Sequence, residues 1–126
     1  PLKDESEIDP NLTDVDYYNN AIKFQNENNM SEALENIEKA IKLKKTLKYL
    51  QYKAYYLQKS EKYNEVINFI YETIDSSEFE NDYYAYYLLG EAQFALKKYT
   101  QSKESYKKSI ELSFINTLFA LFLAHL

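Results

Sequence analysis

The sequence predicts an all-α protein built from stacked pairs of helices, and three observations support this fold class. One Gly and two Pro in 126 residues are too few for a sandwich or a barrel, in which each hairpin needs turn residues. Hydrophobic residues make up 45% of the chain, enough to bury the core of one domain or a short repeat array. Finally, related segments recur three times along the chain at helical spacing.

Composition also excludes several kinds of chemistry. The absence of Cys excludes disulfides, thiolate zinc sites and thiol catalysis, and a single His, His125, excludes multi-His metal sites and a Ser-His-Asp triad elsewhere. We therefore expect no enzyme activity, no cofactor and no bound metal. All 15 basic residues are Lys, and the formal net charge is −5, so we expect no nucleic-acid partner either.

Residues 1–13 are predicted to be an acidic tail or linker. They contain both prolines and show no hydrophobic periodicity. The alternative is that Ile8 and Leu12 pin this segment onto the first helix. Because the chain starts at Pro1 and not at Met, we expect it to be a domain of a longer protein, and both a cytoplasmic and a cell-envelope location stay open.

The helical part, residues 14–126, is predicted to begin with three repeats at about 14–46, 47–82 and 83–113. Met30, Tyr63 and Tyr99 occupy equivalent places in three similar segments, 33 and then 36 residues apart. The same offsets align small residues and then a second set of positions: Ala21, Ala54 and Gly90; Ala33, Val66 and Ser102; Ile37, Ile70 and Tyr106; Ala40, Thr73 and Ser109; Ile41, Ile74 and Ile110.

Each repeat is predicted to be two helices of about 12–14 residues, too short to be stable without packing. The aligned small residues fall where the two helices approach each other closely, and large apolar residues fill the space between them. One repeat cannot bury its apolar face alone, so the three must stack. The longer join between the second and third repeats predicts a loop near residues 76–82.

Residues 114–126, FINTLFALFLAHL, are predicted to be a separate, seventh helix. Ten of these thirteen residues are apolar and none carries a formal charge, but a bilayer span needs about 20 residues. Three interpretations stay open: the helix packs on the third repeat, its outer face (Phe119, Phe122 and Leu126) contacts another chain, or it lies on a membrane surface. His125 is expected to be an interface or helix-end residue.

The pattern of small and large residues resembles the tetratricopeptide repeat family, whose unit is a helical hairpin of 34 residues. The third repeat matches best, with Tyr86-Tyr87-Leu88-Leu89-Gly90 followed by Tyr99 and Ser102. The family's usual Pro after the second helix is missing from all three repeats. The resemblance implies a right-handed solenoid of three helix pairs, here followed by the apolar terminal helix.

The resemblance also implies a concave groove, lined by the first helix of each repeat, that receives a peptide segment or helix of a partner protein. The expected lining residues are Tyr18, Ile22 and Gln25, then Lys48, Gln51, Tyr55 and Gln58, then Tyr84, Tyr87, Glu91 and Phe94, with Val15, Asn26, Lys59 and Ala95 at their margins. Tyrosine offers large rigid contact area with a polar end, which favours binding. The alternative is that these tyrosines reflect composition and pack between helices.

One use of the family is not expected. Adaptors that hold the C-terminal carboxylate of Hsp70 or Hsp90 use Lys, Asn and Arg at positions that are Tyr18, Ile22, Tyr52, Tyr84 and Leu88 here. We therefore expect a non-catalytic protein–protein interaction module (adaptor, scaffold or assembly factor) without that carboxylate clamp. The alternatives are a structural module that forms a homodimer or larger homo-oligomer through the terminal helix, and a non-catalytic domain of a larger enzyme.

Overall fold

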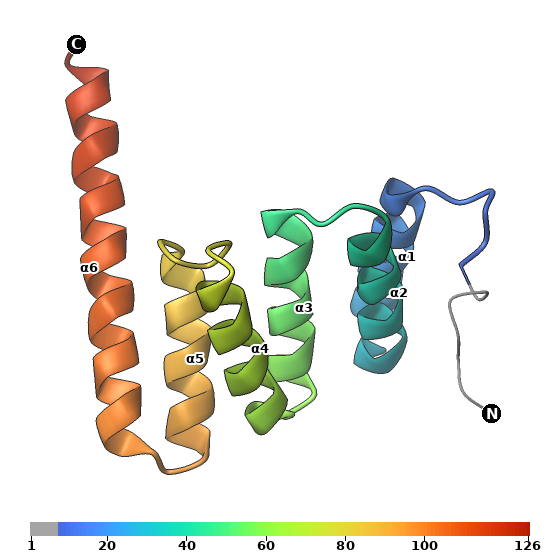
Figure 1. The fold of residues 1–126 in the computed structure, drawn as a ribbon, viewed down its shortest axis with the longest axis horizontal. Helices are drawn as coiled ribbons and strands as arrows, with labels where there is room; N and C mark the ends of the chain where they lie inside the picture. The colour runs from blue at the N-terminus through green and yellow to red at the C-terminus, as the bar shows by residue number, and fades with distance from the viewer. Residues whose placement is uncertain (1–7) are drawn as a thin grey trace. The chain divides into compact units, whose positions relative to one another are not determined.

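The computed structural model describes residues 8–126, which form six helices and no strand (Figure 1). The all-α fold class is therefore confirmed. The helices are α1 (Asp14–Asn26), α2 (Met30–Leu43), α3 (Leu47–Lys59), α4 (Tyr63–Asp75), α5 (Tyr83–Ala95) and α6 (Tyr99–Ala124). They form two compact units: the first ends at Ser60 and contains α1–α3, and the second begins at Glu61 and contains α4–α6. The expected second repeat, residues 47–82, is thus divided between the two units.

In the first unit, α1 and α2 form an antiparallel pair and α3 packs against α2 (Figure 1). Ala21 on α1 and both Ala33 and Ala40 on α2 have no exposed surface. Such small side chains allow two helices to approach closely, and Tyr17 and Ile37 fill the remaining space as buried large residues. The predicted role of the small positions in this helix pair is confirmed.

In the second unit, α5 packs against both α4 and α6. The contact with α6 is closest at Gly90, whose carbonyl oxygen accepts a hydrogen bond of 2.8 Å from the Ser102 hydroxyl. A Cβ atom on Gly90 would lie 2.9 Å from Cδ1 of Tyr106, too close for an unstrained contact. The equivalent residues of the first repeat are Ala21 and the smaller Ile37, so the absence of a Cβ at position 90 matches the larger ring at position 106.

The repeat is also visible in the backbone. Helices α2, α4 and α6 begin at the three aligned residues Met30, Tyr63 and Tyr99. Two residues before each of these starts, Asn28, Glu61 and Lys97 have positive φ angles of 59°, 57° and 62°. The same left-handed turn therefore recurs at both sequence offsets, although none of the three residues is glycine.

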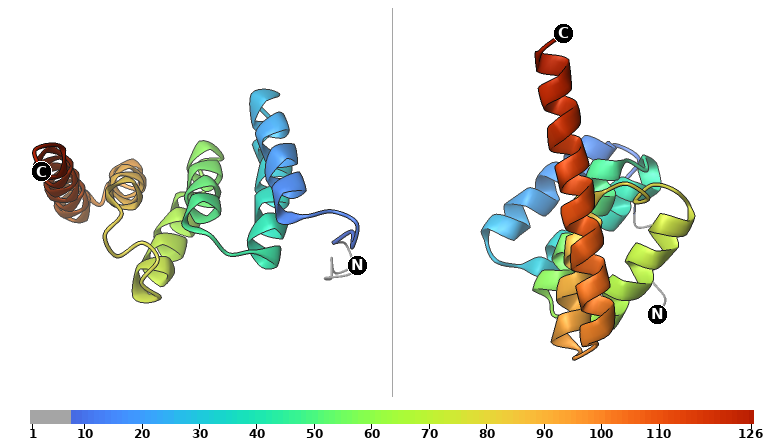
Figure 2. Two further views of the ribbon diagram at one scale, coloured as in Figure 1. Left: turned by 90° about the horizontal axis from the view of Figure 1, so that it is seen from above. Right: turned by 90° about the vertical axis from the view of Figure 1, so that its left-hand side faces the viewer.

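The predicted seventh helix is wrong, because α6 runs without a break from Tyr99 to Ala124. This stretch contains neither Gly nor Pro, so nothing in the sequence ends the helix near residue 113. The Thr117 hydroxyl bonds back to the Ser113 carbonyl oxygen at 3.0 Å, which leaves the helix intact. The C-terminal half of α6 extends past the end of α5 (Figure 2). The predicted loop near residues 76–82 is confirmed, since it separates α4 from α5.

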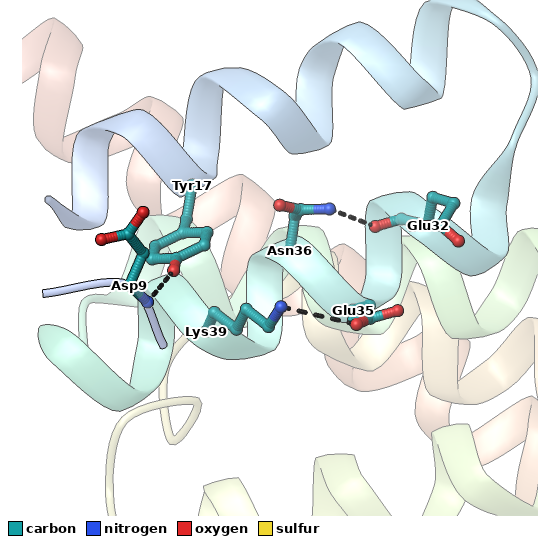
Figure 3. A network of polar contacts seen from close by, with 6 residues as sticks. All are labelled: Asp9, Tyr17, Glu32, Glu35, Asn36 and Lys39. Atoms are coloured by element: carbon teal, nitrogen blue, oxygen red, sulfur yellow. Dashed lines mark hydrogen bonds and ion pairs between the residues drawn. The ribbon is translucent and has the colours of Figure 1, made fainter. Parts of the chain in front are cut away.

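Residues 8–13 are attached to the first unit by hydrogen bonds. The Asp9 N–H donates to the Tyr17 hydroxyl at 2.8 Å (Figure 3). Thr13 and Asp16 form a capping box at the start of α1, and these hydrogen bonds lower the pKa of Asp16 below its usual value. The rest of the predicted tail, residues 1–7, lies outside the described part of the chain. Close to Tyr17, Lys39 pairs with Glu35 at 3.4 Å, which places one lysine of α2 in a surface ion pair (Figure 3).

Candidate functional site

Tyrosines of α3 connect this helix to α1 in the first unit. Tyr49, Tyr52 and Tyr56 are spaced by three and then four residues, which places them on one face of the helix. The side-chain hydrogen bonds are Tyr49 to Asp14 at 2.6 Å, Tyr18 to Tyr52 at 3.3 Å and Tyr56 to Gln25 at 2.8 Å, the first residue of each pair donating. Several tyrosines of this unit therefore do pack between helices, as the alternative interpretation proposed.

The expected groove residues of the first unit take part in contacts between helices or are partly buried. Tyr18 and Gln25 are already engaged by α3 through the bonds just described. The Lys48 ammonium lies 4.2 Å from the centre of the Tyr18 ring, a close cation–π contact. Tyr55 is half-buried beside Tyr56, with ring centres 5.8 Å apart. The other expected residues, Ile22, Gln51 and Gln58, are also half-buried.

Burial raises the pKa of two phenols in this cluster. Desolvation, assisted by the hydrogen bond to Asp14, raises the pKa of Tyr49 to about 12. Burial likewise raises the pKa of Tyr56 well above its ordinary value. Both phenols are therefore protonated at neutral pH and donate the hydrogen bonds to Asp14 and Gln25 described above.

A different surface is open in the second unit, between α5 and α6. Two adjoining hollows of about 570 and 500 Å³ lie there, and Ile110 lines both. We call their combined surface the α5/α6 groove. Its main lining residues are Phe94, Tyr99, Tyr106 and Ile110 in one hollow, and Tyr83, Tyr84, Tyr87, Ile110 and Phe114 in the other.

Aromatic rings dominate the α5/α6 groove. The ring centres of Phe94 and Tyr99 are 5.4 Å apart, and those of Tyr87 and Tyr106 are 6.1 Å apart. Tyr87 and Phe94 are nevertheless 43% and 58% exposed, so much of their surface is available to another molecule. The charge of the neighbouring Glu91 carboxylate and a side-chain hydrogen bond to it raise the pKa of Tyr87.

The groove thus includes expected residues of the third repeat and some that the sequence analysis missed. Tyr84, Tyr87 and Phe94 line it as expected, whereas Glu91 is half-buried beside Tyr87 without lining either hollow. The residues that the sequence did not indicate all belong to α6: Tyr99, Tyr106, Ile110 and Phe114. They were missed because the resemblance implies a groove lined by the first helix of each repeat alone. The signal that could have indicated them is the break in the polar periodicity of α6 at Ile110 and Phe114.

The repeat offset relates the α5/α6 groove to a helix contact in the first unit. On α1, the residues bonded to α3 are Asp14, Tyr18 and Gln25. The residues 69 positions later, at the offset of the third repeat, are Tyr83, Tyr87 and Phe94, and all three line the α5/α6 groove. The groove is therefore the counterpart of the place that α3 occupies in the first unit, and within residues 61–126 no helix fills it.

The C-terminal half of α6 is a second exposed apolar surface. Phe119, Phe122 and Leu126, the expected contact residues, are all exposed. His125 follows the last helical residue as the C-cap, in agreement with the helix-end interpretation. Among the described helices, none has both the length and the hydropathy of a membrane span.

Between residues 8 and 126, no three His, Cys, Asp or Glu side chains gather in a way that would hold a metal ion. No protein-family model matches the chain, and a search of curated proteins finds no match either. The open surface that stands out among the described residues is the aromatic α5/α6 groove.

Proposed function

We propose that this chain is a tetratricopeptide-type helical repeat that acts as a non-catalytic protein-interaction module. Its working surface is the α5/α6 groove, which receives a helix from another polypeptide. One observation carries the proposal: the three groove residues Tyr83, Tyr87 and Phe94 stand where the first unit uses Asp14, Tyr18 and Gln25 to hold α3. A site that accepts a helix in one repeat is suited to accept one in another.

The chemistry of the groove supports a helix more than a small molecule. Its two hollows share Ile110 and are open to solvent, so they offer a strip of rings and not an enclosed pocket. Exposed tyrosine and phenylalanine side chains are frequent anchors of protein interfaces, because they bury a large area with few rotatable bonds. Serine and threonine at positions 113 and 117 add hydrogen-bonding groups to the strip.

The experiment is affinity capture from lysate of the source cells with the tagged 126-residue chain. Tyr87→Ala combined with Phe94→Ala should reduce capture at least about tenfold, since truncating one interface anchor can cost about 2 kcal/mol. Both side chains are exposed, so helicity by circular dichroism should not change. The matched control is Glu104→Ala with Lys108→Ala, two exposed residues of α6 outside the groove. Loss of capture in the control pair, with retention in the aromatic pair, would refute the proposal.

A further inference from the structure

Two uncovered apolar surfaces of the second unit match each other in length and chemistry. One is the α5/α6 groove, and the other is the segment of residues 114–126. This segment has thirteen residues, the same number as α3, which occupies the corresponding place in the first unit. It carries no formal charge, so no charged side chain would have to be desolvated on the apolar strip of the groove.

The segment cannot fill the groove of its own chain. It continues the helix that forms one wall of that groove, and α6 is unbroken through residues 113 and 114. Its end therefore lies beyond α5, as Figure 2 shows. A groove of the same kind within its reach must belong to another copy.

Helix direction agrees with a segment that enters the groove of another copy. In the first unit, α3 runs antiparallel to α2 (Figure 1). If two α6 helices pair in antiparallel fashion about a twofold axis, the terminal half of each runs antiparallel to the α6 that lines the groove it enters. This is the direction that α3 has on α2, so a symmetric pair reproduces the packing already present in the chain.

On this basis, which rests on the proposed function of the groove, we propose that two copies of the chain pair through antiparallel α6 helices. Residues 114–126 of each copy lie in the α5/α6 groove of the other. Phe114, near the middle of the overlap, lies beside its own counterpart.

The exposed area is large enough for such a dimer. Nine large apolar side chains between Ile110 and Leu126 are at least half exposed, and Phe114 is 63% exposed. Taking about 200 Å² for a large side chain, they leave on the order of 1,000 Å² of apolar surface in solvent per copy. Burial of roughly two thirds of it in both copies gives about 1,300 Å², within the range of about 1,200–2,000 Å² found for stable interfaces.

The first test is sedimentation of the complete 126-residue chain over a wide range of concentration. The expected result is twice the mass of the single chain, with dissociation on dilution. Deletion of residues 114–126 removes no buried side chain, so the variant should keep its fold and sediment as a monomer. Tyr87→Ala with Phe94→Ala should weaken dimerisation at least tenfold although the terminal segment is intact. A monomeric wild type, or a dimer that survives the deletion, would overturn the inference.

The second test uses the absence of cysteine in the sequence. Phe114→Cys introduces a single thiol, and mild oxidation should link it to its counterpart in a covalent dimer. Lys108→Cys, an exposed residue of α6 outside the groove, should form little of this product. Equal yields from the two variants would contradict the antiparallel register.

These outcomes separate the inference from the proposed function. A monomeric chain that still loses a captured partner through Tyr87→Ala and Phe94→Ala would overturn self-pairing and leave the groove as a binding site. A dimer unaffected by those two substitutions would place the contact between copies outside the groove and overturn the inference, and loss of partner capture in the same variant would still support the proposed function.

Discussion

Gly90→Ala tests the packing that joins α5 to α6. A Cβ atom at this position would lie 2.9 Å from Cδ1 and 3.0 Å from Cε1 of Tyr106. Carbon atoms in favourable contact are about 3.5–4.0 Å apart, so the ring or the helix must move by roughly half an ångström or more. Overpacking of this kind costs about 1–3 kcal/mol, and the better helix propensity of Ala returns about 1 kcal/mol. We expect Gly90→Ala to lower the free energy of unfolding by about 1 kcal/mol in total.

The sign of this effect should reverse when the ring is removed. The first repeat has Ala21 and Ile37 at the equivalent positions, both fully buried. In a Tyr106→Ile background, Gly90→Ala should therefore stabilise the fold by about 0.5–1 kcal/mol through helix propensity alone. Urea unfolding of the four proteins in this double-mutant cycle gives the coupling energy, which we expect to be about 2 kcal/mol. The same change in stability in both backgrounds would refute the steric argument.

Three further predictions concern the first unit and a turn. Tyr49 stays protonated in the folded state up to about pH 12 but loses its proton near pH 10 when unfolded, so stability should fall as pH rises through this window, and less steeply in Tyr49→Phe. Tyr17→Phe removes the acceptor of the Asp9 N–H and should lower the free energy of unfolding by about 1 kcal/mol, measured by thermal denaturation. An unchanged melting temperature would mean that this hydrogen bond does not stabilise the fold. Lys97→Gly relieves a residue with a φ of 62° and should raise stability by up to about 1 kcal/mol, whereas a lower melting temperature would contradict the turn geometry.

The sequence predicted the helices and their core positions well, because spacing and side-chain size are local properties. The aligned residues Ala33, Ile37 and Ala40 are all buried, and the offsets of the repeat recur in helix starts and turn angles. The separate terminal helix was wrong because the change to an apolar composition after residue 113 suggested a new element, although the sequence contains no residue that ends a helix there. Apolar composition alone does not show whether a segment folds back or continues.

The candidate site was less predictable, because side-chain partners depend on packing between helices. Tyr18 and Tyr87 are equivalent in the repeat, yet Tyr18 bonds to Tyr52 whereas Tyr87 lines an open groove. Nothing in the two local sequences predicts this difference in packing. The difference arises because α3 covers the first helix pair and no helix of the second unit covers α5 and α6 in the same way.

The most direct test of the central claim is photo-crosslinking at the groove in the source cells. A benzoylphenylalanine at position 87 replaces an exposed ring of the groove, and the same group at position 108 serves as the control on α6. We predict a discrete adduct with another polypeptide from position 87, either a second copy or a different chain, and little or none from position 108. Equal crosslinking at both positions, or no adduct at position 87, would contradict the assignment of the α5/α6 groove as the binding surface.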